Sequence, residues 1–395
     1  MIRKIPLIAA VLLCAVQFYA QSTDPVVLSY QRNFVRASMS TKIELLNDAS
    51  RISSINMAQL YVDALGFAVD SLPVLGSDAQ LMELASVAAS RASSYQDPAI
   101  LPAVRSAFKS IPDARVRVSC LNTWSALAKG QKDEIAFLNA WYAESLDLAQ
   151  KGTQPDVKVM SSCASALGKI GDASSFAVLF RGSVSNIDSS VVQASATALN
   201  AINEGYTDGI LAIIAKKGIK DMYAAFSLAM KKESLSQADR ARIAAAAFET
   251  GTAITLAGGD SQGSTLSILI LESMGQLTAL KWSEASPAVV RYFYRIQGDY
   301  KNDRGIVDLL IPVAQCMGAM KTQEAAQALS IFLGLLNSET EQKKTYNEQL
   351  LLAVIQALGD LGDKTAFDYL LYVGYLDYPE SVKKASRDAL ARLQW

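Results

Sequence analysis

Two stretches of this chain, 191 positions apart, carry nearly the same pattern. Ser165–Gly182 reads SALGKIGDASSFAVLFRG and Gln356–Val373 reads QALGDLGDKTAFDYLLYV, with seven of eighteen positions identical. At the same offset Val191 falls on Val382, so about 35 residues align without a gap. Self-similarity over a unit of this size is typical of stacked repeats, none of which can bury its apolar face alone.

Each copy encodes the end of one helix, a tight turn and the start of the next helix. Apolar residues recur at helical spacing up to Leu167, and Gly168 leaves room for a neighbouring helix. Gly171 suits the left-handed conformation that ends a helix, and Asp172 can cap the following one. We expect Phe176 to face back onto the preceding helix. The second copy places the same features at Leu358, Gly359, Gly362 and Asp363.

Partial copies of this pattern extend along most of the chain. A leucine or methionine in the role of Leu167 recurs in DALGF, SALAKG, ESMGQL and QCMGAM. Intervals of 32 to 43 residues between these anchors fit one helical pair, and two longer intervals each predict a concealed, degenerate pair. The anchors are Leu65, Leu127, Leu167, Leu199, Met274, Met317, Leu358 and Leu390.

The pattern resembles HEAT repeats, especially the short HEAT-like units of bilin lyases. It rests on Ala166, Leu167, Gly168, Gly171 and Asp172 and on their second copies. The arginine usual in that family after the valine of the second helix is replaced by Val192 and Lys383.

The resemblance implies an all-α fold, a right-handed α–α superhelix of about nine helical pairs, and the following organisation. A cap would occupy 21–55, HEAT-like repeats 56–203 and 262–395, and degenerate repeats with a loop 204–261.

The first twenty residues are typical of a secretory signal peptide. Arg3 and Lys4 precede an apolar run from Ile5 to Phe18, and the small residue Ala20 suits cleavage. We expect cleavage after Ala20 and an exported, periplasmic protein. Lipidation at Cys14 is the alternative.

Composition excludes several classes of function. The 37 basic and 38 acidic residues give none of the positive excess that a nucleic-acid-binding protein needs. The absence of histidine excludes a Ser-His-Asp triad and metal sites with imidazole ligands. Cys120, Cys163 and Cys316 lie in apolar helical patterns and are expected to be buried thiols. We therefore expect no catalytic residue, cofactor or metal.

Two aromatic stretches are candidates for recognition, because aromatic and arginine side chains are favoured at binding hot spots. One contains Trp141 and Tyr142, for which a buried helix face is the alternative interpretation. The glycine- and serine-rich stretch 250–267 predicts a loop between helices, since no lysine follows its glycines as a phosphate loop requires. The other aromatic stretch contains Arg291, Tyr292, Tyr294, Arg295 and Tyr300.

These features predict a scaffold that binds an unidentified protein partner in the bacterial envelope. An elongated repeat surface generally binds other macromolecules. Two alternatives remain open. The aromatic side chains would serve a binder of peptidoglycan or another carbohydrate, and the resemblance to bilin lyases implies an enzyme that attaches a pigment.

Overall fold

The structure is a computed structural model that describes residues 24–256, 263–302 and 307–394. The chain divides into two compact units, Met1–Ala201 (unit 1) and Ile202–Trp395 (unit 2). The signal peptide expected over 1–20 and the alternative lipidation site at Cys14 lie outside the described residues.

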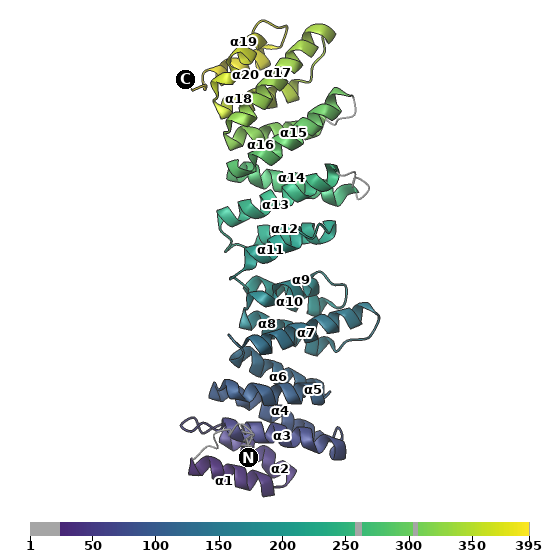
Figure 1. Ribbon diagram of the computed structural model, residues 1–395, viewed down its shortest axis with the longest axis vertical. Helices are drawn as coiled ribbons and strands as arrows, with labels where there is room; N and C mark the ends of the chain where they lie inside the picture. Colours follow the sequence, from purple (N-terminus) through teal and green to yellow (C-terminus); the bar gives the residue numbers. More distant parts are fainter. Residues whose placement is uncertain (1–23, 257–262, 303–306, 395) are drawn as a thin grey trace, which may run out of the picture. The chain divides into compact units, whose positions relative to one another are not determined.

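The described residues form twenty α-helices, with a few 3₁₀ turns and one isolated β-bridge between Asp363 and Gln394 (Figure 1). The all-α repeat fold predicted from the sequence is therefore confirmed. Unit 1 contains α1 (Pro25–Arg36), α2 (Met39–Ala49), α3 (Ala58–Leu75), α4 (Ala79–Ala92), α5 (Leu101–Ser110), α6 (Ala114–Leu127), α7 (Lys132–Gln150), α8 (Val157–Ile170), α9 (Phe176–Ser183) and α10 (Ser189–Ala201). Unit 2 contains α11 (Tyr206–Ile214), α12 (Ile219–Lys231), α13 (Gln237–Leu256), α14 (Gly263–Leu280), α15 (Ser286–Lys301), α16 (Val307–Met320), α17 (Gln323–Lys343), α18 (Glu348–Leu361), α19 (Phe367–Val373) and α20 (Glu380–Leu390).

Within each unit the helices pair in chain order, α1 with α2 through α9 with α10, and α11 with α12 through α19 with α20. The even-numbered helices form one layer, in which each helix packs on the next even-numbered helix. The odd-numbered helices form the second layer (Figure 1). Each helix thus buries one side against its partner and its edges against the helices of the same layer.

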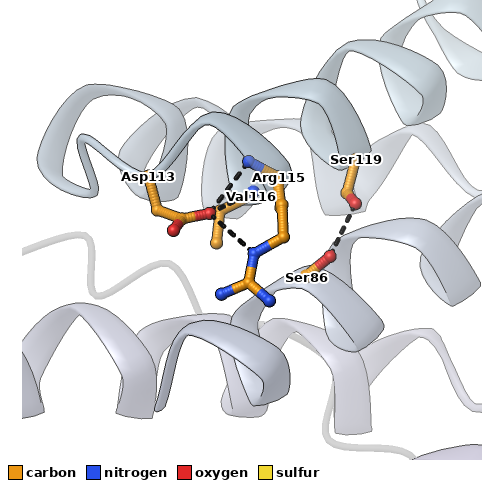
Figure 2. A network of polar contacts seen from close by, with 5 residues as sticks. All are labelled: Ser86, Asp113, Arg115, Val116 and Ser119. Atoms are coloured by element: carbon orange, nitrogen blue, oxygen red, sulfur yellow. Dashed lines mark hydrogen bonds and ion pairs between the residues drawn. The ribbon is translucent and has the colours of Figure 1, made fainter. Parts of the chain in front are cut away.

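Side-chain caps and hydroxyl contacts hold these helices in place, as the start of α6 shows (Figure 2). The Asp113 carboxylate accepts hydrogen bonds from the backbone N–H groups of Arg115 at 2.8 Å and Val116 at 3.1 Å. A cap of this kind stabilises a helix by about 1 kcal/mol. One turn further on, the Ser119 hydroxyl lies 2.9 Å from the Ser86 hydroxyl and links α6 to α4 in the even layer.

The turn after α8 has the predicted left-handed glycine and the predicted aspartate cap. Gly171 has a φ of 71°, and its N–H bonds to the Leu167 carbonyl. The Asp172 side chain accepts hydrogen bonds from Ser174, which hold the pKa of that carboxyl below its usual value. Gly362, with a φ of 69°, and Asp363 repeat this arrangement after α18.

The expectation that Phe176 faces the preceding helix stays a prediction, and the main contacts of its helix lie with other helices. Helix α9, which Phe176 begins, packs on α10 and on α7. The side of α8 near its C-terminal end is instead occupied by α10. The glycine–aspartate turn therefore joins one helical pair to the next.

Close approach within the even layer depends on helical glycines. A Cβ atom built on Gly168 would lie 2.5 Å from both the Cα and the Cβ of Ala198 on α10. A Cβ on Gly318 of α16 would lie 2.8 Å from the Cα of Ala357 on α18. Gly359 differs, because the side chain beside it is the guanidinium of Arg392 rather than another helix backbone. Two of these glycines thus permit backbone contact between neighbouring even helices.

The anchor residues are buried with one exception, and they do not all occupy the same layer. Leu167 and Leu358 are fully buried. Leu65 is also buried, but it lies on α3, an odd helix. The next anchor, Leu127, lies on α6, so the even helix α4 between them carries no anchor residue. Leu390, on the last even helix, is only partly buried. In the second long interval α12 is the concealed even helix, so both intervals contain the predicted extra helices.

The prediction of a loop over 250–267 is wrong at both ends, where helix α13 continues to Leu256 and helix α14 begins at Gly263. Residues 257–262 lie outside the described residues.

The three cysteines are buried and free, as predicted. Burial raises the pKa of Cys120 to about 12 and of Cys316 to about 11, and it raises the pKa of Cys163 as well. The thiolate forms that react are therefore disfavoured at neutral pH.

We expect the motif glycines to respond in opposite directions to alanine. Gly168→Ala should lower the free energy of unfolding by about 1–2 kcal/mol, because the new methyl group overlaps Ala198. Gly275→Ala, at the same motif position on α14 with nothing within 4 Å of the added Cβ, should raise it by about 0.5–1 kcal/mol through helix propensity. Urea unfolding measures both values. Equal effects of the two substitutions would contradict the close helix contact.

Candidate interaction surface

Two of the residues predicted to form an interaction surface are buried, which corrects that prediction. Tyr142 is fully buried, and its hydroxyl lies 2.6 Å from the Ser195 hydroxyl, so it links α7 to α10. Burial raises its pKa to about 12. Tyr292 is 8% exposed, with its ring edge-on to Phe248. Helical periodicity separates Tyr292 from Tyr294, because side chains two positions apart in a helix point to opposite sides.

Two other predicted residues are partly buried and belong to structural clusters. The Trp141 ring packs edge-on against Phe108 at 5.1 Å between centroids, inside an aromatic cluster of unit 1. Tyr300 packs against Phe332, and its hydroxyl donates to Glu339 at 3.2 Å, which links α15 to α17. Both residues contribute to packing between neighbouring helices.

The remaining predicted residues, Arg291, Tyr294 and Arg295, lie on the exposed face of α15. Tyr294 is 48% exposed, and Arg295 forms an ion pair with Asp299 at 3.2 Å one turn later. Their spacing of three and four positions places these three residues on one side of α15.

The next two odd helices continue this face with apolar side chains. Ile331 on α17 is 49% exposed, Leu371 and Tyr372 on α19 are also exposed, and Tyr375, in the turn after α19, is 76% exposed. Helices α15, α17 and α19 pack on one another in order. We define the odd-layer patch as Arg291, Tyr294, Ile331, Leu371, Tyr372 and Tyr375.

The patch has a regular register set by the turns that precede the odd helices. Those turns contain Lys281, Lys321 and Gly362, all with positive φ. Arg291, Ile331 and Tyr372 each stand ten residues after these turn residues, and Tyr294, Gly334 and Tyr375 stand thirteen residues after them. The first count therefore falls on equivalent positions of three successive helices, whereas the second ends in the turn after α19.

Polar and van der Waals contacts hold the patch residues of α19 against α17. The Tyr372 hydroxyl donates to Glu341 at 2.7 Å, and this bond raises the pKa of Tyr372. The Tyr369 ring lies over Gly334, where an added Cβ would be 2.8 Å from the ring. The patch is thus supported by contacts between helices rather than carried on isolated loops.

Sequence reasoning missed Ile331, Leu371, Tyr372 and Tyr375. A signal was present, because Lys281 and Lys321 occupy the turn position that Gly171 and Gly362 occupy elsewhere. Counting from these lysines would have aligned α15 and α17 with α19. A glycine in the sequence indicates a left-handed turn, whereas a lysine does not.

The described residues contain no group of three acidic or cysteine side chains placed to hold a metal ion. In the same part of the chain, no helix is both long and apolar enough to cross a bilayer.

Comparison with known proteins gives likenesses of structure only. No protein-family model and no curated protein matches the chain. A solved engineered protein has 21% identity over 93% of this chain and 98% of its own, with a TM-score of 0.36. Human deoxyhypusine hydroxylase in complex with glycerol has 15% identity over 85% of this chain and 97% of its own, with a TM-score of 0.28. At these identities and scores neither likeness transfers a ligand or an activity.

Substitution of two nearby tyrosines on α15 should distinguish a side chain that packs in the core from one that is available for recognition. Tyr292→Ala should lower the free energy of unfolding by about 3 kcal/mol, because it empties a buried site beside Phe248. Tyr294→Ala should change it by less than about 0.5 kcal/mol, because that ring is half exposed. Chemical denaturation of the two variants compares them directly. A large loss for Tyr294→Ala would show that its ring supports the fold.

Proposed function

We propose that this chain is an exported HEAT-like repeat scaffold that binds a protein partner in the bacterial envelope through the odd-layer patch. The helical-repeat fold and the two glycine–aspartate turns support the HEAT-like assignment. The basic head, apolar run and small residue of the first twenty positions support export.

The observation that carries the proposal is the set of exposed, mostly apolar and aromatic side chains on α15, on α17 and on α19 with the turn that follows it. Isolated exposed apolar residues are ordinary, but a set that continues across neighbouring helices marks a binding surface. Tyrosine and arginine are also favoured in the energetic centres of protein interfaces, and both occur here. Ile331 lies on the middle helix of the three.

The support beneath the patch favours binding with little loss of entropy. Side chains that are already fixed before association lose less conformational freedom when a partner binds. Glu341 fixes the Tyr372 hydroxyl, and Gly334 lets the Tyr369 ring pack flat against α17. Backbone atoms of α17 and α19 also approach closely.

The carbohydrate-binding alternative loses most of its support. A sugar ring stacks on an exposed aromatic face, whereas Tyr142 and Tyr292 are buried and Trp141 packs on Phe108. Tyr294 and Tyr375 remain exposed, but they accompany aliphatic side chains that suit a protein surface better than a polar sugar.

Export predicts a defined mature N-terminus. When the full chain is expressed in a Gram-negative host, the protein should accumulate in the periplasmic fraction and begin at Gln21. Edman sequencing or intact mass measures the cleavage site. A Cys14-lipidated form would begin at that cysteine and carry the lipid mass, and an uncleaved protein retained in the cytoplasm would contradict export.

The odd-layer patch should be the region that contacts the partner. A photo-crosslinking amino acid at Ile331 or Tyr375 should capture the same envelope protein from a periplasmic extract. The matched control is Gln356, which is exposed on the even helix α18 and should capture nothing.

The double variant Ile331→Ser, Tyr375→Ser should reduce co-purification of that protein by at least about tenfold, since each exposed apolar contact is worth about 1 kcal/mol. Circular dichroism and the melting temperature should stay unchanged. Equal capture at Ile331 and Gln356 would place the interface elsewhere.

A further inference from the structure

Unit 2 contains a second feature, a hollow of about 700 Å³ where α14, α16 and α18 end. Its lining includes three cationic side chains, Lys281, Lys321 and Arg392, and a single carboxylate, Asp360. We call this feature the basic hollow. Gly318 and Gly359 form part of its wall.

One of the three cationic side chains, that of Arg392, already has a partner within the hollow. The Arg392 guanidinium lies over Gly359 and forms an ion pair with Asp360 at 2.6 Å. The chain after α20 is fixed at this edge, because the Gln394 N–H donates to the Gly362 carbonyl at 2.8 Å. Within the described residues, no ion pair involves Lys281 or Lys321, and both are exposed. The hollow therefore has an excess of positive charge.

The two lysines occupy an unfavourable backbone conformation. Lys281 has a φ of 52° and Lys321 a φ of 54°, where equivalent turns of the chain use Gly171 and Gly362. A residue with a Cβ is disfavoured in this region relative to glycine. Lys217 and Lys344 share the conformation but do not line the hollow. Among these four lysines with positive φ, Lys281 and Lys321 are the two that also line the hollow.

The remaining walls favour a ligand with hydrogen-bond donors as well as negative charge. The last turns of α16 and α18 line the hollow, and the final carbonyl groups of a helix have no partner inside the helix. These carbonyls carry partial negative charge, so they favour N–H donors and disfavour any anionic group placed directly against them. A peptide supplies N–H donors for the carbonyls and separate carboxylates for the lysines.

We propose that the basic hollow binds an acidic segment of another protein. Carboxylates of the segment pair with Lys281 and Lys321, while its backbone N–H groups face the helix ends. The site differs from the odd-layer patch in its residues and in its chemistry, and it stands whether or not the patch binds a partner.

Fluorescence anisotropy with a labelled oligoglutamate peptide tests the proposal on the mature full chain. The peptide should bind at low salt and lose most of its affinity at about 0.5 M salt, where exposed charges are screened. The double variant Lys281→Gly, Lys321→Gly should bind about tenfold more weakly, since each exposed ion pair contributes up to about 1 kcal/mol. Glycine suits the backbone at both positions, so the fold is retained.

The control is the double variant Lys217→Gly, Lys344→Gly. It removes the same two positive charges and places glycine in the same kind of turn, but at positions outside the hollow. It should leave the affinity for oligoglutamate within about twofold, a difference of about 0.4 kcal/mol. Equal losses in the two double variants would show attraction by net charge alone and would overturn the proposal. Absence of binding by the unmodified chain, or displacement of the peptide by millimolar inorganic phosphate, would overturn it too.

Discussion

The contact between neighbouring even helices is the constraint on which the two-layered arrangement depends. Where Gly168 meets Ala198, and where Gly318 meets Ala357, the backbones approach so closely that not even one methyl group can be added. Dispersion contacts fall steeply with distance, so such an approach gains packing energy along the whole helix. Leu167, one residue before the first glycine, is fully buried beside the contact.

The close contact in one layer determines what the other layer can do. Because each odd helix starts from a turn at the end of an even helix, the spacing of the even layer fixes the register of the odd layer. Equivalent positions of α15, α17 and α19 therefore fall into one row, which contains Arg291, Ile331 and Tyr372. The same turns hold Lys281 and Lys321 at the edge where the basic hollow opens. Both proposed binding features thus follow from one repeated turn.

The parts of the fold that sequence reasoning predicted are those with local causes. Gly171 adopts its left-handed conformation and Asp172 caps the next turn because only nearby atoms are involved. The main partners of α9, which are α10 and α7, have no such local cause, because they depend on which helices fill the space around α9. Tyr292 and Tyr294 were predicted as one surface, yet two positions along a helix separate a buried side chain from an exposed one.

The sequence by itself determined the class of fold, the helix ends at the glycine–aspartate turns and the burial of the three cysteines, since each follows from local conformational preference or apolar periodicity. Only the tertiary structure decided that α15, α17 and α19 present one row of exposed side chains, because this row joins residues about 40 positions apart in sequence. It also decided that two lysines and the chain after α20 share one hollow. These residues meet only because each helix packs at a particular position along its neighbour, and no local sequence pattern specifies that position.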